Sequence, residues 1–287
     1  MNGSLARAGL LALCVAAAGA PGQPAPSPLA DGDAHWDRRA EGAVGDSCAP
    51  AEVDAAIASY RRALSTAPES LALRARLMRA LQYRGAFCAG PLDESRRALD
   101  EGKDVAEETV ARVERLVGGA KGEARLAALR RTPEAAAVYF WAAACWGQWA
   151  VLHGNFAAAR EGVAGKVREL ARTVVDLDER YEEAGGHRVL GRLHDKTPSI
   201  PFITGWASTK KALAHLRTAI ALAPDDRAAQ LFLGEALLAH VPGERAEALR
   251  LLTACATAPP RPEYLVEDRR QAKQARALLD ADGAHRR

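Results

Sequence analysis

The amino-acid sequence predicts an all-α protein built from antiparallel helix hairpins. Its 287 residues are dominated by Ala, Leu, Arg and Glu, whereas Ile and Thr are sparse, and this composition favours helix over sheet. Apolar residues recur at the 3.6-residue spacing of a helix, and no segment alternates convincingly as a strand. Gly and Pro pairs break the chain into segments of helix length.

Composition and charge exclude several classes of protein. Hydrophobic residues make up 48% and charged residues 26%, so the chain is neither disordered nor a bundle of membrane helices. The net charge of +3 is too small to argue for nucleic acid, and no basic run carries interleaved aromatic residues. We therefore expect no nucleic-acid partner.

Residues 1–18 are predicted to be a signal peptide for export. Arg7 precedes an apolar run, Ala8–Ala20, that is too short and too Ala-rich to anchor in a bilayer, and Ala16-Ala17-Ala18 offers a cleavage site. One alternative is a lipid anchor at Cys14, although Leu13 makes a poor lipobox; the other is an uncleaved leader that tethers the protein to the membrane. All three place the body of the chain outside the cytoplasm, in the periplasm or cell envelope.

The rest of the chain is predicted to form one domain between two flexible ends. Residues 19–34 contain the segment PGQPAPSP and are expected to be a Pro-rich flexible tether, because closely spaced prolines cannot continue a helix or pair in a sheet. Residues 35–282 are expected to form a single helical-repeat domain. Residues 283–287 are expected to be a disordered tail.

Breaks at Pro68, Gly90-Pro91 and Gly118-Gly119 set the expected ends of the first helices. Thr132 is expected to cap the next helix, and Gly185-Gly186 to stop a later one. A short helix at Arg188–Leu193 and a loop held by Pro198 and Pro201 follow. The helices expected apart from the apolar one described next are Ala51–Ala67, Ser70–Phe87, Leu92–Val117, Asn155–Glu183, Trp206–Leu222, Arg227–Ala239, Glu244–Ala256 and Pro262–Leu279.

One helix differs from the others in its composition. Ala135–Leu152 contains no charged residue, so it is either buried at the centre of the fold or spans a membrane. Its Ala content and the presence of Gly147 and Gln148 favour a buried central helix. The further alternative is an exposed apolar face used for binding.

An internal repeat defines the architecture more closely. Two stretches share the pattern small-x3-large-x2-small-x4-Pro: they are Ala56, Tyr60, Ala63, Pro68 and Ala212, Leu216, Ala219, Pro224. The small residues let a neighbouring helix approach, and each copy is followed by another amphipathic helix, as in tetratricopeptide repeats. Because the middle of the chain loses this period, we expect a tetratricopeptide-like α-solenoid with degenerate central repeats. A generic helical bundle is the alternative.

The cysteines predict one disulfide. Cys48 precedes the first of these helices and Cys88 ends the second, so an antiparallel hairpin brings them to the same end, and export permits oxidation. Cys145 and Cys255 are expected to be small buried residues. No Cys-x2-Cys or close Cys/His spacing occurs, so no metal site is expected.

The sequence shows no catalytic motif. It has no phosphate-binding glycine loop, no Gly-x-Ser-x-Gly and no His-Glu-x-x-His, so we expect neither enzymatic activity nor a cofactor. His187 and His194 are too far apart on one helix to share a metal without a third ligand. His153 and His215 stand alone and are expected to be structural.

Two groups of residues are candidates for ligand or partner binding. The first comprises Tyr139, Trp141, Trp146 and Trp149, which either pack in the core or line an apolar pocket. The second comprises His187 and Arg188 beside the Pro-rich loop, where Arg188 is available for a carboxylate. The alternative for the second is a helix end followed by a structured connector.

The chain resembles one known family, the T components (TatT) of tripartite ATP-independent periplasmic (TRAP) transporters. The resemblance covers roughly His35–Leu279 and depends on AIASYRRAL at Ala56–Leu64, the aromatic helix from Tyr139 to Trp149, and the run Gly185–Asp226. Within that run the spacing Gly186-x4-Gly191, the two loop prolines and the closing Ala-Pro are the most typical parts.

The resemblance implies an exported, all-helical, non-enzymatic protein. Its partners would be a periplasmic solute-binding protein and a TRAP permease, and the solute a small organic acid or hydrophobic ligand. Family members are often lipoproteins, from which Leu13 departs, and some are thought to assemble into homo-oligomers.

Two other functions compete with this one. The first is a general periplasmic adaptor in envelope assembly, and the second is a hydrolase or lyase in a helical pocket. A closed apolar cavity near Trp141 and Trp149 would favour the transport accessory, and an open groove alone would favour the adaptor.

Overall fold

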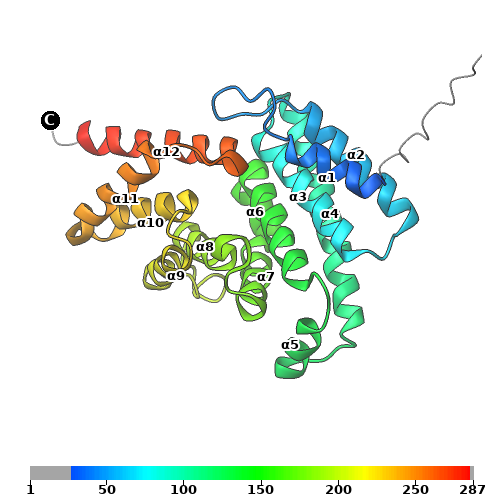
Figure 1. Ribbon diagram of the computed structural model, residues 1–287. Coiled ribbons are helices and arrows are strands. Elements are labelled where there is room, and N and C mark those ends of the chain that lie inside the picture. Colours follow the sequence, from blue (N-terminus) through cyan, green and yellow to red (C-terminus); the bar gives the residue numbers. More distant parts are fainter. Residues whose placement is uncertain (1–26, 285–287) are drawn as a thin grey trace, which may run out of the picture.

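The computed structural model describes residues 27–284, which form twelve α-helices and two 3-10 turns, with only isolated β-bridges besides. The predicted all-α fold is confirmed (Figure 1). The signal peptide, Cys14 and half of the predicted tether, residues 19–26, lie outside the described residues. The helices are α1 (Pro28–Asp37), α2 (Ala51–Thr66), α3 (Leu71–Phe87), α4 (Leu92–Leu116), α5 (Gly122–Arg130), α6 (Ala135–Arg160), α7 (Val163–Leu177), α8 (Tyr181–Lys196), α9 (Thr209–Leu222), α10 (Arg227–His240), α11 (Arg245–Thr257) and α12 (Leu265–Ala284).

The first helix corrects the predicted extent of the tether. Residues 28–34 belong to α1, which begins with Ser27 as cap and Pro28 in the first turn. Two carboxylates hold α1 on α2: Asp31 accepts from the Ser59 hydroxyl at 2.5 Å and Asp33 from the Tyr60 hydroxyl at 2.8 Å. These partners lie about 27 residues away along the chain, so local sequence could not reveal them. At the other end, α12 continues to Ala284, two residues beyond the predicted domain.

Most helices pack as antiparallel hairpins with their neighbours in sequence. In four hairpins a glycine of the first helix lies against a large side chain of the second, at a distance that leaves no space for a Cβ atom. The shared contact confirms a helical-repeat arrangement. The four pairs are Gly32 with Tyr60, Gly85 with Leu99, Gly191 with Leu216, and Gly234 with Leu252.

The structure also reveals a third copy of the sequence repeat. Ala248, Leu252, Cys255 and Pro260 keep the same spacing as the two predicted copies, and the first three are buried in α11. Cys255 occupies the second small position, so its predicted role as a small buried residue is explained by the repeat.

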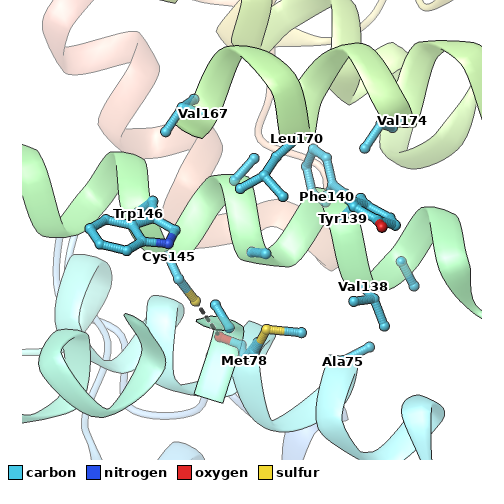
Figure 2. Packing of buried hydrophobic residues seen from close by; sticks show 14 of the residues in the cluster. Ala75, Met78, Val138, Tyr139, Phe140, Cys145, Trp146, Val167, Leu170 and Val174 are labelled. Atoms are coloured by element: carbon cyan, nitrogen blue, oxygen red, sulfur yellow. Dashed lines mark hydrogen bonds between the residues drawn. The ribbon is translucent and has the colours of Figure 1, made fainter. Parts of the chain in front are cut away.

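The apolar helix α6 lies at the centre of the molecule, as predicted. Figure 2 shows its residues between Ala75 and Met78 of α3 on one side and Val167, Leu170 and Val174 of α7 on the other. Among the described residues, α6 is the one helix long and apolar enough to span a membrane, but more than half of its apolar window is buried inside the protein. Core packing therefore explains its composition.

The boundaries around α7 and α8 differ from prediction. The predicted helix Asn155–Glu183 is three pieces: Gly154, with φ of 84°, kinks α6, and Gly162 separates α6 from α7. Gly185 and Gly186 do not stop a helix but lie inside α8. A Cβ on Gly185 would lie 2.3 Å from the Phe140 ring, so these glycines serve close helix packing.

The cap predicted for α6 is also wrong. The Thr132 hydroxyl donates to the Ala128 carbonyl at the end of α5, and Glu134, with a φ of 62°, is the residue that precedes α6. The hydroxyl is therefore used by a local bond to the carbonyl four residues earlier, at the end of α5, which the Thr-Pro-Glu pattern alone does not reveal.

Helix α12 joins the two ends of the fold. Figure 1 shows it beginning near the N-terminal helices and running from there past α10 and α11. Its Val266 is fully buried among N-terminal residues that include Trp36 and Tyr83. Arg270 donates to the Asp46 carbonyl at 2.8 Å and also to the Ala86 carbonyl. The repeat array is therefore closed by its own last helix.

Candidate functional site

The four predicted aromatic residues of α6 do not form one site. Trp141 lines a hollow between α1, α3, α6 and α8, whereas Tyr139 and Trp146 line another between α4, α6 and α7. Trp149 lines neither. Since successive helix positions differ by about 100°, a single helix delivers its aromatic residues to different neighbours.

The Trp141 hollow has a volume of about 430 Å³. Trp36, Trp141 and Tyr181 supply aromatic walls, and Arg76 and Arg79 approach from α3. Arg76 is paired with Asp33 at 3.0 Å, and the Arg79 guanidinium lies 4.1 Å from the centre of the Trp36 ring. The buried Nε of Arg79 has no hydrogen-bond partner among the described residues. Asp33, Asp37 and Glu134 add carboxylates to the rim, so this hollow is polar as well as aromatic.

A strained turn borders the Trp141 hollow. Directly after Tyr181, residues Glu182, Glu183 and Ala184 have φ values of 48°, 56° and 58°, a conformation that costs L-residues free energy. Burial raises the pKa of both glutamate carboxyls. Runs of strained residues persist where surrounding contacts enforce them, and they are common at functional sites.

Arg188 is the residue that holds this turn. It donates to the carbonyl oxygens of Glu182 and Glu183 at 3.3 and 3.5 Å, and it also pairs with the buried carboxylate of Asp226. The structure therefore places Arg188 among partners from its own chain, where it braces the strained turn and lines none of the three hollows described in this section.

The second hollow, at Trp146, has a volume of about 600 Å³ and a more apolar lining. Lys166 lies 3.9 Å from the centre of the Trp146 ring. At the opposite end, the Tyr139 hydroxyl donates to Glu114, which is also paired with Arg125 at 2.6 Å. That pair holds the pKa of Glu114 below its usual range, while burial raises the pKa of Tyr139.

Trp149 belongs to the core. Its indole Nε1 donates to Asp100 at 2.7 Å, and its ring stacks on His153 at 4.4 Å and meets Trp146 edge-on at 5.8 Å. Of the three hollows described in this section, Trp141 lines the first, and Trp149 lines none.

His187 lies beside a histidine that we expected to stand alone. Its Nδ1 lies 3.0 Å from Nδ1 of His215, and His194 stacks on His215 with 5.9 Å between ring centres. His194 and His215 line a third hollow, of about 420 Å³, between α7, α8 and α9. The signal in the sequence is weak: His187 and His194 lie two turns apart on one helix face, and His215 follows His187 by 28 residues. His215, expected to stand alone, is therefore part of a cluster.

Cys48 and Cys88 lie side by side at the end of the first hairpin, as the topology predicts. The Cys48 amide donates to the Phe87 carbonyl at 2.9 Å, and the Ala89 amide donates to the Cys48 carbonyl at 2.8 Å. Both cysteines are free thiols in contact with one another, and that contact lowers the pKa of Cys48. The disulfide between them stays a prediction. Within the described residues no group of three side chains could hold a metal ion.

The described residues therefore form an all-α helical-repeat protein whose helices enclose hollows of ligand size. The sequence matches the family model described as TRAP transporter T-component over residues 56–284, more than three quarters of the chain. The chain belongs to this family, which associates it with a TRAP transport system and with the periplasm or cell envelope. No curated protein matches the sequence.

Proposed function

We propose that this chain is an exported, non-enzymatic accessory of a TRAP-type transport system. In this role it docks the periplasmic solute-binding protein that serves the permease, and it holds a small ligand in the Trp141 hollow. Family membership and the export signal predicted from the sequence support the location and the system.

The Trp141 hollow is the observation that carries ligand binding. Aromatic side chains from α1, α6 and α8 converge there on Arg79, whose buried Nε lacks a partner. A buried donor without a partner costs free energy, so a ligand that accepts its hydrogen bond would be stabilised there. The volume of about 430 Å³ lies in the range of small-molecule sites.

The Pro-rich loop between α8 and α9 supports docking of a partner. Three of its residues are exposed although they are large and apolar: Ile200 at 46%, Phe202 at 106% and Ile203 at 72%. Exposed apolar groups of this kind mark protein interaction surfaces more often than isolated apolar residues do. The predicted partner-contacting loop therefore has a side-chain composition suited to that role.

Trp141→Ala is expected to remove a small ligand that co-purifies with the wild-type protein, because it opens one aromatic wall of the hollow. Native mass spectrometry of protein purified from the cell envelope measures the bound mass. Trp149→Phe is the matched control: it loses the hydrogen bond to Asp100 and lowers stability, but leaves the hollow intact. Equal ligand retention by wild type and Trp141→Ala would contradict ligand binding at this hollow.

Cross-linking in the cell envelope tests the partner. Recovery of a solute-binding protein or TRAP permease with the wild type is the expected result. Recovery of outer-membrane or assembly proteins alone would favour the general adaptor instead.

A further inference from the structure

We propose that the hollow between α7, α8 and α9 is a second binding site, specific for a small organic anion with an apolar body. We name it the histidine hollow, and its defining side chains are Arg168, Arg172, His194, Trp206, Lys211 and His215. It is separate from the Trp141 hollow and does not depend on the transport partner.

One side of the histidine hollow is cationic. Arg168 and Arg172 reach it from α7 and Lys211 from α9, whereas Asp176 is the one carboxylate of its lining. Arg168 and Arg172 both approach Glu169, at 2.9 and 4.0 Å. Lys211 forms no ion pair with any residue in the range 27–284. The excess positive charge favours an anion and opposes a metal dication.

The other side is apolar. Leu190 is buried in the wall, Val175 is half-buried, and Trp206 lies edge-on to His194 with ring centres 5.2 Å apart. The Arg168 guanidinium lies 4.5 Å from the centre of the Trp206 ring, which leaves its donors at the boundary between the two sides. A ligand that is charged at one end and apolar at the other matches this arrangement, and about 420 Å³ accommodates a small one.

A buried ring nitrogen without a partner points to a ligand at the same place. His194 is only 7% exposed, and its Nδ1 is buried without a hydrogen-bond partner in the described part of the chain. Such an atom destabilises the empty site unless something accepts or donates a hydrogen bond there. A carboxylate oxygen would accept from a protonated Nδ1, which supplies the missing partner.

The lowered pKa values of the three histidines are consistent with burial and with a cationic surrounding that favours an anion. Burial and then the neighbouring His187, His194, Lys211 and Arg172 lower the pKa of His215 to about 4. Burial also lowers the pKa of His187 and His194, and on His194 the charges of Lys211 and Arg168 act in the same direction. Of the acidic groups nearby, Asp176 lines the hollow and Glu179 opposes the shift on His187.

These charges determine how the affinity for an anion depends on pH. A bound anion stabilises the imidazolium form, so it raises the histidine pKa values above those of the empty protein. Between the two values, binding takes up protons, and the anion binds more tightly as pH falls.

Calorimetric titration of the purified chain with 3-phenylpropionate tests the proposal, with 3-phenylpropanol as its uncharged counterpart. We expect binding of the acid and not of the alcohol, with tighter binding at about pH 6 than at about pH 8. Lys211→Gln should weaken binding about tenfold, since a charge-assisted hydrogen bond is lost. His194→Gln should reduce the pH dependence.

Lys210→Gln is the matched control, because this exposed neighbour has the same charge and lies outside the lining. It should bind like the wild type. Lys211 is itself exposed, so its variant is expected to fold. Absence of binding, equal binding of acid and alcohol, or equal effects of Lys210→Gln and Lys211→Gln would overturn the proposal. Recovery of transport partners would be unaffected by that failure.

Discussion

At the scale of single residues, two side chains with the same exposed fraction differ in their hydrogen bonds. Trp149 and His194 are both 7% exposed. The Trp149 indole has a carboxylate partner, whereas Nδ1 of His194 has none. Buried polar atoms are nearly always paired in folded proteins, and in the proposal above a bound anion supplies the partner that His194 lacks.

The cysteine pair gives the prediction at this scale. Under oxidising conditions Cys48 and Cys88 should form a disulfide, because the bridge between their backbones already sets them at neighbouring positions. Closing a loop of about 40 residues should raise the free energy of unfolding by about 4 kcal/mol in the chain-entropy model. Chemical denaturation with and without reductant measures the difference, and Cys48→Ser should abolish it. Free alkylation of both thiols in protein from the cell envelope would show that no bridge forms.

At the scale of elements, glycine positions fix how closely the hairpins approach. Gly191 of α8 lies against Leu216 and the Ala212 carbonyl of α9, and both of these residues belong to the sequence repeat. The contact joins the helix bearing His187 and His194 to the helix bearing His215, so the hairpin geometry also sets the spacing of the histidine hollow.

Gly191→Ala should destabilise the protein by about 1–3 kcal/mol, because its Cβ would lie 2.5 Å from Leu216. Gly147→Ala is the control: no atom lies within 4 Å of its Cβ, and alanine favours helix, so stability should be unchanged or higher. Thermal unfolding of both variants gives the comparison, and equal midpoints would contradict the role of Gly191.

At the scale of the whole molecule, α12 joins the C-terminal hairpins to the N-terminal ones. Arg270 bonds two backbone carbonyls of the N-terminal region, whereas nearby Lys273 makes an exposed ion pair with Asp46. Variants of these two residues therefore compare the contribution of the backbone hydrogen bonds with that of an exposed ion pair.

Arg270→Ala should lower the free energy of unfolding by about 1–3 kcal/mol, since it leaves carbonyl oxygens without partners. Lys273→Ala should change it by less than about 1 kcal/mol. Hydrogen exchange should show lost protection in α1–α3 as well as in α12 for the first variant. Loss confined to α12 would argue against closure.

Local patterns predicted most of this fold, and tertiary contacts decided the rest. Stripes at helical spacing and Ala-Pro repeats lie within single helices, so the hairpins and the central position of α6 were foreseeable. Gly185-Gly186 was misinterpreted because glycine both ends helices and admits close neighbours, and only the position of Phe140 distinguishes the two. The histidine hollow needed the mutual register of three helices, which no single stretch of sequence contains.

The closing helix also has a consequence for biogenesis. The cluster around Trp36 and Tyr83 includes Val266, which a ribosome adds more than two hundred residues after Trp36. The N-terminal hairpin therefore cannot complete its core while the chain is still being made. For the export proposed above, this is an advantage, because a polypeptide that stays incompletely folded until its last helix is released remains a substrate for a translocation channel that accepts only unfolded chains.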